Sequence, residues 1–158
     1  YYINYMIKLS KMTDYAVVCL GTLARRPGYF MSANELSKET GLALYTVQKL
    51  LKLLVSKSDF VKANRGALGG YMLNRNSSEI SVVEIIEALD GPITLTSCVD
   101  NSDSFCESSD ICFLGGKWNK INEIIRKSLN DISLKELLSY ENPFLIDDNK
   151  DALIDRIN

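Results

Sequence analysis

The feature that most constrains the fold is a pair of predicted helices joined by a short turn that contains glycine. Residues 32–35 (Ser-Ala-Asn-Glu) have the spacing of a capping box, in which serine and glutamate side chains satisfy backbone amides at a helix start. A helix is therefore predicted over residues 32–40, and Gly41 ends it. Apolar residues recur at helical spacing over residues 44–56, which predicts a second helix. This order is typical of a helix-turn-helix, although an ordinary helical hairpin has the same pattern.

A short hairpin is predicted directly after the second helix. Residues 60–64 and 71–74 have the composition of strands, and a glycine-rich turn, residues 65–70, lies between them. A hairpin in this position is typical of a wing. Its glycines let the tip approach a phosphate backbone closely, and Arg65 is well placed to enter a minor groove. Because glycine is common in every kind of hairpin tip, the prediction depends on the order of the elements.

The second helix and the wing supply candidate contacts to double-stranded DNA. Polar and basic side chains near the start of the helix can reach base edges and phosphates when the helix lies in a major groove. Residues 1–75 hold 11 of the 18 Lys and Arg residues and 4 of the 20 Asp and Glu residues, and such a basic half-chain favours a polyanionic partner. The candidate DNA-binding residues are Tyr45, Thr46, Gln48, Lys49, Lys52, Arg65 and Gly66.

Further helices are predicted on both sides of this unit. Residues 11–25 have one apolar face, which includes Cys19. We interpret Cys19 as a small buried hydrophobic residue and not as a reactive thiol. Residues 81–84 (Ser-Val-Val-Glu) form a second capping box, which starts a helix over residues 81–89. The residues expected to be buried in that helix are Val82, Ile85, Ile86 and Leu89.

A long helix is predicted over residues 117–130. Its apolar stripe contains Trp118, Ile121, Ile125 and Leu129, and Ile124 widens the stripe. Apolar surface of this width suits pairing with a second copy of the chain, while packing in its own core explains the pattern equally well. A third capping box at residues 133–136 starts a last short helix, in which Leu134, Leu137 and Leu138 are expected to be buried.

These elements predict a mainly α fold with a small β wing, a winged helix-turn-helix plus a long dimerisation helix. The expected units are a DNA-binding domain (6–91), a cysteine-rich cluster-binding loop (92–116), the dimerisation helix with the short C-terminal helix (117–139) and an acidic tail (140–158). No apolar run reaches the roughly 18 residues that a transmembrane helix needs, and the first residues lack the pattern of a signal peptide. A cytoplasmic location without membrane contact is therefore expected.

Three of the four cysteines, Cys98, Cys106 and Cys112, lie within fifteen residues of one another. Their neighbours are serine, aspartate, asparagine and glutamate, which predicts a loop. Three thiols on one loop indicate a metal or iron–sulfur site. The chain has no histidine, which excludes Ser–His and Cys–His nucleophile pairs and every zinc site that needs an imidazole. Neither a Cys-x-x-Cys motif nor a glycine-rich phosphate loop is present, so an enzyme is not expected.

With these motifs placed, the chain resembles the Rrf-two family of bacterial winged-helix transcriptional regulators over about residues 9–138. The resemblance implies a homodimer held by the long helix, DNA binding by the winged helix, and a 2Fe-2S or 4Fe-4S cluster on Cys98, Cys106 and Cys112. The chain looks similar to members that control SUF iron–sulfur assembly genes. The segments that carry the resemblance are residues 9–16, 42–50, 65–71, 84–91, the three-cysteine loop and residues 133–137.

Two positions depart from the family pattern. IscR-like members have a histidine three residues after the last cysteine, and here that position is Gly115. In NsrR-like members an aspartate of the partner subunit supplies the last cluster ligand, and the matching residue is Asp14; a carboxylate favoured by the helix dipole is an equal explanation. Glu107 and Asp110 on the loop are alternatives. The wing tip also has Ala-Leu at residues 67–68 where the family usually has proline.

Two other interpretations of the cysteines stay open. Cys106 and Cys112 could form a thiol–disulfide switch in a DNA-binding regulator that has no cluster, because five intervening residues allow the required approach. The loop could instead be clamped by zinc in a structural or partner-binding protein. Structural zinc pairs usually have two to four intervening residues, so the observed spacings of seven and five fit that interpretation poorly.

Overall fold

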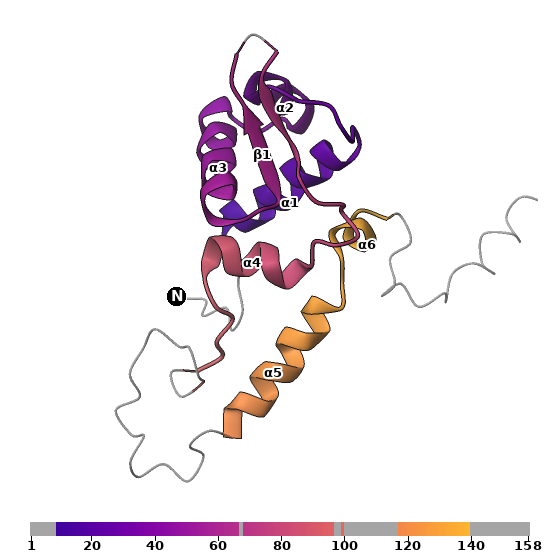
Figure 1. Ribbon diagram of the computed structural model, residues 1–158. Helices are drawn as coiled ribbons and strands as arrows, with labels where there is room; N and C mark the ends of the chain where they lie inside the picture. Colours follow the sequence, from indigo (N-terminus) through magenta and orange to yellow (C-terminus); the bar gives the residue numbers. More distant parts are fainter. Residues whose placement is uncertain (1–8, 67, 97–98, 100–116, 140–158) are drawn as a thin grey trace, which may run out of the picture.

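The computed structural model of the 158-residue chain describes residues 9–66, 68–96, 99 and 117–139 (Figure 1). The predicted mainly α fold with a small β wing is confirmed. Most element boundaries agree with the sequence prediction to within two residues. In chain order, the described elements are α1 (Lys11–Ala24), α2 (Ala33–Thr40), α3 (Leu44–Lys57), β1 (Val61–Asn64), β2 (Gly70–Leu73), α4 (Val82–Asp90), α5 (Lys117–Asn130) and α6 (Leu134–Leu138).

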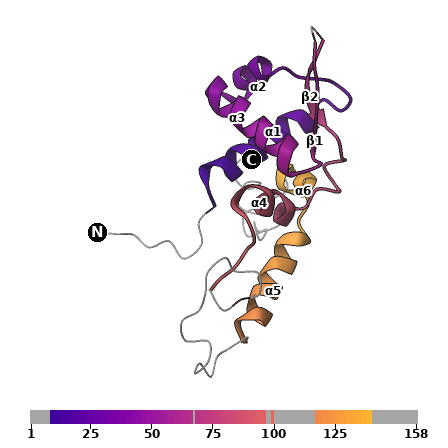
Figure 2. The ribbon, with the colours of Figure 1, turned by 60° about the vertical axis from the view of Figure 1, so that its left-hand side comes forward.

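The elements form two regions that meet at α4. Helices α1, α2 and α3 gather with the hairpin at one end, while α5 extends away from them on the other side of α4 (Figures 1 and 2). Helix α1 is central to the first region, because it packs against α2, α3, α4, α6 and β2. The last helix, α6, returns to this region and fully buries Leu134 there. The winged unit is therefore completed by residues from the far end of the described chain.

The core agrees with most of the apolar faces predicted from the sequence. In α1 the side chains of Ala16, Cys19, Leu20 and Leu23 are buried, while Met12 packs at the edge. Burial raises the pKa of the Cys19 thiol to about 11, as expected for a thiol that acts as a core hydrophobic residue. The predicted stripe of α3, which is Val47, Leu50, Leu51 and Leu54, is also fully buried.

Some details of the predicted burial are wrong. In α4 the buried residues are Val83, Ile85 and Ile86, whereas Val82 and Leu89 are half-buried. Val82 is the first helical residue and lies at the junction with α6, where its amide donates to the Ile132 carbonyl at 2.9 Å. In α6 the Leu137 side chain is 47% exposed. A helix of five residues turns one narrow face inward, and that face is the i, i+4 pair Leu134 and Leu138.

Helix α5 buries little of its own apolar stripe. Ile121 is 45% exposed and Ile124 is 57% exposed, and the buried residue of this helix is the polar Asn122. Within the described ranges, no helix combines the length and apolarity that crossing a bilayer requires.

Candidate nucleic-acid interface

The turn between α2 and α3 is built by local hydrogen bonds. Gly41 caps α2 in the left-handed region, with φ of 72°, and its amide donates to the Ser37 carbonyl at 3.0 Å. The Ser37 hydroxyl then donates to the Leu42 carbonyl at 2.7 Å, so it fixes the chain as it leaves the turn. This arrangement sets the start of α3, at which the predicted contact residues begin.

The outer face of α3 contains the predicted DNA-contact residues of this helix. Because the apolar stripe of α3 faces the core, Tyr45, Gln48, Lys49 and Lys52 are exposed, and Thr46 is half-buried. The helix contains no acidic residue, so all of its formal charge is positive. Helices of this kind suit the negative potential of a DNA groove.

The wing consists of β1, β2 and the residues between them. Asn64 pairs with Gly70 at the end of the antiparallel ladder, and the Gly69 amide donates to the Gly66 carbonyl at 3.0 Å. A Cβ atom on Gly69 would lie 2.4 Å from the Asn64 carbonyl oxygen, so this tight return needs glycine. At the tip, Leu68 is 92% exposed. Arg65 is also exposed, and no other described residue forms an ion pair with its guanidinium.

A backbone contact attaches the wing to the helical unit. Met31, just before α2, pairs with Tyr71 of β2 through two backbone hydrogen bonds of 2.9 and 2.8 Å. Gly70 permits this approach, because a Cβ atom there would lie 2.5 Å from the Met31 carbonyl oxygen. The hairpin is therefore extended by one short bridge to the chain that enters α2.

A groove of about 540 Å³ lies between the wing, α3 and the start of α2. It brings together three predicted contact residues, because Lys52, Arg65 and Gly66 all line it. Tyr45, Thr46, Gln48 and Lys49 lie on α3 outside the lining of this groove. The sequence prediction missed Asn64, Val55 and Tyr71, which also line it. The sequence does not show that these residues lie together, since the groove forms only when the wing packs beside α3.

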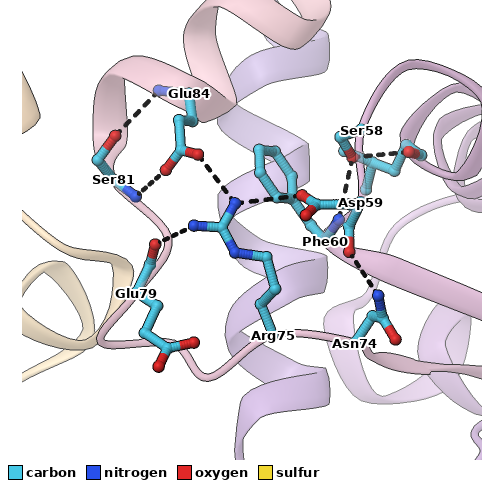
Figure 3. A network of polar contacts seen from close by, with 9 residues as sticks. Ser58, Asp59, Phe60, Asn74, Arg75, Glu79, Ser81 and Glu84 are labelled. Carbon is cyan, nitrogen blue, oxygen red and sulfur yellow. Dashed lines mark hydrogen bonds and ion pairs between the residues drawn. The ribbon is translucent and has the colours of Figure 1, made fainter.

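The base of the wing holds a polar network that the sequence prediction missed (Figure 3). The Arg75 guanidinium donates to Asp59 Oδ1 at 3.1 Å and to Glu84 Oε1 at 2.9 Å, and it also contacts the Glu79 carbonyl oxygen. The hydrogen bonds that Arg75 donates to Glu84 and Asp59 raise the pKa of Arg75. Burial alone would raise the pKa of Glu84, but hydrogen bonds from Ser81 and Arg75 hold it below its usual value.

The chain that leads toward the cysteines is fixed to α5 by a buried amide. Asn122 Oδ1 accepts from the Leu95 amide at 3.0 Å, and Asn122 Nδ2 donates to the Ile93 carbonyl at 2.8 Å. On the neighbouring turns, Arg126 forms a double hydrogen bond of 2.7 and 2.8 Å with the Glu87 carboxylate. Helix α4 and the segment after it are therefore tied to α5.

The predicted cluster ligands on the loop, Cys98, Cys106 and Cys112, lie outside the described residues, as do Glu107, Asp110 and Gly115. Among the residues that are described, no group of three or more Cys, Asp or Glu side chains is suited to a metal ion.

Asp14 is exposed in the first turn of α1. Within the described part of the chain its carboxylate has no ion pair or hydrogen bond. The helix begins beside the end of α4, because the Ser10 amide donates to Asp90 Oδ2 at 3.0 Å. The cysteine-rich loop leaves α4 just after Asp90, so the start of α1 and the start of this loop lie close together.

Comparison with known proteins identifies relatives over nearly all of these elements. Residues 9–140 match the model of the Rrf2 family, described as iron-dependent transcriptional regulators. The chain is 30% identical over 146 residues to the HTH-type transcriptional regulator IscR of Sodalis glossinidius, which covers 92% of this chain and 87% of that protein. It is 32% identical over 107 residues to IscR of Photorhabdus laumondii, covering 68% of this chain and 63% of the relative.

Solved structures of similar regulators have the same fold. CymR of B. subtilis, the global cysteine regulator, superimposes with a TM-score of 0.63 at 26% identity, over 86% of this chain and 99% of that chain. The T. potens IscR structure superimposes with a TM-score of 0.58 at 27% identity, over 84% and 86%. Because these relatives are transcriptional regulators, the prediction that the chain is not an enzyme is confirmed. This chain belongs to the Rrf2 family of DNA-binding transcriptional regulators.

Proposed function

We propose that this regulator responds to iron–sulfur, redox or nitric-oxide status through a cluster held by Cys98, Cys106 and Cys112. The observation that carries the proposal is the set of three thiols within one short polar segment. The iron dependence in the description of the family and the likeness to IscR both support it. The neighbouring geometry supports it as well, since the segment before Cys98 is bonded to α5 and leaves directly from α4.

The residues of the chain fit such a group in donor chemistry. Thiolates are the preferred ligands of iron–sulfur clusters, and Asp14 of the partner subunit is our candidate for the remaining ligand. Its carboxylate is exposed and, among the described residues, unpaired, so it is free to face a second chain. When bound, a cluster with one hard carboxylate ligand supplies a labile centre that oxygen, nitric oxide or iron shortage can remove. Visible spectroscopy of the purified protein distinguishes a 2Fe-2S cluster from a 4Fe-4S cluster.

The proposed ligand set requires a homodimer, and α5 offers the surface for one. Ile121 and Ile124 expose apolar area on a helix that extends away from the winged unit. Two-fold pairing of this surface would give two winged helices for two half-sites on double-stranded DNA. DNA would then be read by the α3 face and by the wing of each copy.

Anaerobic purification tests the cluster. We expect the protein to be brown, with iron and sulfide present, and Cys106→Ala to be colourless. The buried thiol gives a matched control: Cys19→Ala removes a cysteine from the core and should keep the colour. A colourless wild-type protein, purified anaerobically from cells with a normal iron supply, would contradict the proposal.

The likeness to CymR, named as a cysteine regulator, supports a second candidate that binds DNA without a cluster. In that candidate Cys106 and Cys112 form a thiol–disulfide switch. Mass spectrometry with and without reductant separates the two, because a two-hydrogen mass difference without iron or sulfide indicates the switch. Zinc without sulfide, together with no salt-dependent DNA binding, would indicate the zinc-clamped protein instead.

A further inference from the structure

The wing is a small hairpin that needs support at its base. Each of its strands has four residues, and an isolated two-stranded hairpin is at best marginally stable in water. Contact with Met31 supports β2 along one edge. The tip residues that would approach DNA lie at the other end of the ladder from the base. A small rotation at the base is therefore amplified at the tip, because the displacement grows with the length of the hairpin.

Arg75 joins three segments at this base. It follows the end of β2, its partner Asp59 precedes β1, and its partner Glu84 lies in the first turn of α4 (Figure 3). The guanidinium carbon also lies 5.8 Å from the centroid of the buried Phe60 ring, within the range of a cation–π contact. Nearby, the Asn74 amide donates to the Phe60 carbonyl at 2.8 Å. Both strands are thus fastened to each other and to α4.

Arg75 differs from the basic residues that are candidates for DNA contact. Its guanidinium is already bonded to two carboxylates and one carbonyl, and its side chain is 27% exposed. Arg65 at the tip is exposed, and within the described residues it forms no ion pair. Helix α4 gives Arg75 a firm anchor, because α4 packs on α1, α3 and α5. The positive charge of Arg75 is thus paired with carboxylates of the same chain.

We propose that Arg75 is a positioning residue for DNA binding: it fixes the wing to α4 and so holds Arg65 beside Lys52 in one groove. Arg75 does not touch DNA itself. Its contribution to affinity is made through the contact of Arg65 with the DNA. Removal of that contact should therefore remove most of the effect of Arg75, which a double-mutant cycle measures directly.

The experiment compares the full chain with Arg75→Gln, Arg65→Gln and the double variant under anaerobic conditions. The probe is a 30-base-pair duplex that the wild-type protein has selected from a random library. We expect each single variant to bind roughly 5-fold more weakly, and the double variant to bind about as weakly as Arg65→Gln alone. The slope of log affinity against log salt should fall by about one in Arg65→Gln, with no further fall in the double variant.

Arg126→Gln is the control for charge. Like Arg75→Gln it removes one cation, but this cation lies on α5, and its ion pair connects α5 to α4 and not to the wing. Arg126→Gln should leave the DNA affinity unchanged.

If Arg75→Gln does not fold, Glu84→Gln decides the question, because glutamine retains the cap on Ser81 while removing the ion pair. The proposal is overturned if the losses of affinity in Arg75→Gln and Arg65→Gln add in the double variant. It is also overturned if Arg75→Gln binds DNA as tightly as Arg126→Gln at the same folded fraction.

Discussion

At the scale of single residues, Gly70 marks the point where the wing backbone comes closest to the helical unit. Its Cβ position lies 2.5 Å from the Met31 carbonyl oxygen and 3.1 Å from the Ser32 amide nitrogen, and both are backbone atoms that cannot rotate away. The wing can dock on the chain before α2 only when this position has no side chain.

Gly70→Ala should therefore lower the free energy of unfolding by about 2 kcal/mol or more and weaken DNA binding. Gly28→Ala is the matched control, since Gly28 has a positive φ of 80° but no atom within 4 Å of its Cβ position. That control should cost only about 1 kcal/mol of backbone strain. Urea unfolding measures both variants, and equal losses would show that close approach at Gly70 is not the cause.

At the same scale, burial of Cys19 should make the free energy of unfolding depend on pH. Burial raises its pKa from 9.0 to about 11, so above pH 9 the unfolded chain binds fewer protons than the folded chain. The free energy of unfolding should fall as the pH rises between these two values, by up to roughly 3 kcal/mol. Urea unfolding at about pH 8 and about pH 10 checks this. Cys19→Ala should lack this part of the decrease, and an identical decrease in both proteins would contradict it.

At the scale of elements, α4 connects the parts of the molecule through three acidic residues. Glu84 pairs with the base of the wing, Glu87 with α5, and Asp90 with the start of α1. Their spacing is three residues each time, so they lie along one side of a nine-residue helix. The hydrogen bonds that these carboxylates accept, which for Glu84 include those from Ser81, hold each pKa below its usual value, against the effect of burial.

Acid should therefore weaken the contacts that connect α4 to the wing, α5 and α1. A carboxylate with a lowered pKa stabilises the folded state above its unfolded pKa, and that stability is lost as the pH falls through the folded value. The bond from Arg126 is the main cause for Glu87, ahead of the opposing effect of burial. In Arg126→Gln, the difference in unfolding free energy between about pH 6 and about pH 3 should be smaller by up to about 1 kcal/mol. Lys127→Gln, a neighbouring residue without an ion pair in the described chain, should behave like the wild type.

At the scale of the whole molecule, the exposed isoleucines of α5 allow the proposed dimer to be tested. Ile124→Glu places a charge on the apolar face and should convert a dimer to a monomer in analytical ultracentrifugation, with a loss of DNA affinity. Glu123→Gln changes a charge on the polar face of the same helix and should remain dimeric. A monomeric wild-type protein at micromolar concentration would contradict the proposed pairing.

Local signals made much of this architecture predictable, and long-range contacts explain most of what was missed. The serines of the three capping boxes, Ser32, Ser81 and Ser133, gave the helix starts because cap and partner are three residues apart. Arg75 and Asn122 gave no such signal. Arg75 bonds to Asp59, sixteen residues away, and Asn122 bonds to Ile93 and Leu95, which are 29 and 27 residues away. Their partners come within hydrogen-bonding distance only when the chain folds.

The Asn122 contacts also determine where the chain that leads toward the three cysteines lies relative to α5. Leu95 is held against α5 about one and a half turns from Lys117, where the described chain resumes. The two described segments that flank the three cysteines in the sequence therefore lie close together at α5. When two ends of a flexible loop are fixed in this way, each doubling of the loop length generally adds only about 0.6 kcal/mol to the free energy of closure. We therefore expect insertions or deletions between residues 96 and 117 to leave the DNA-binding unit folded.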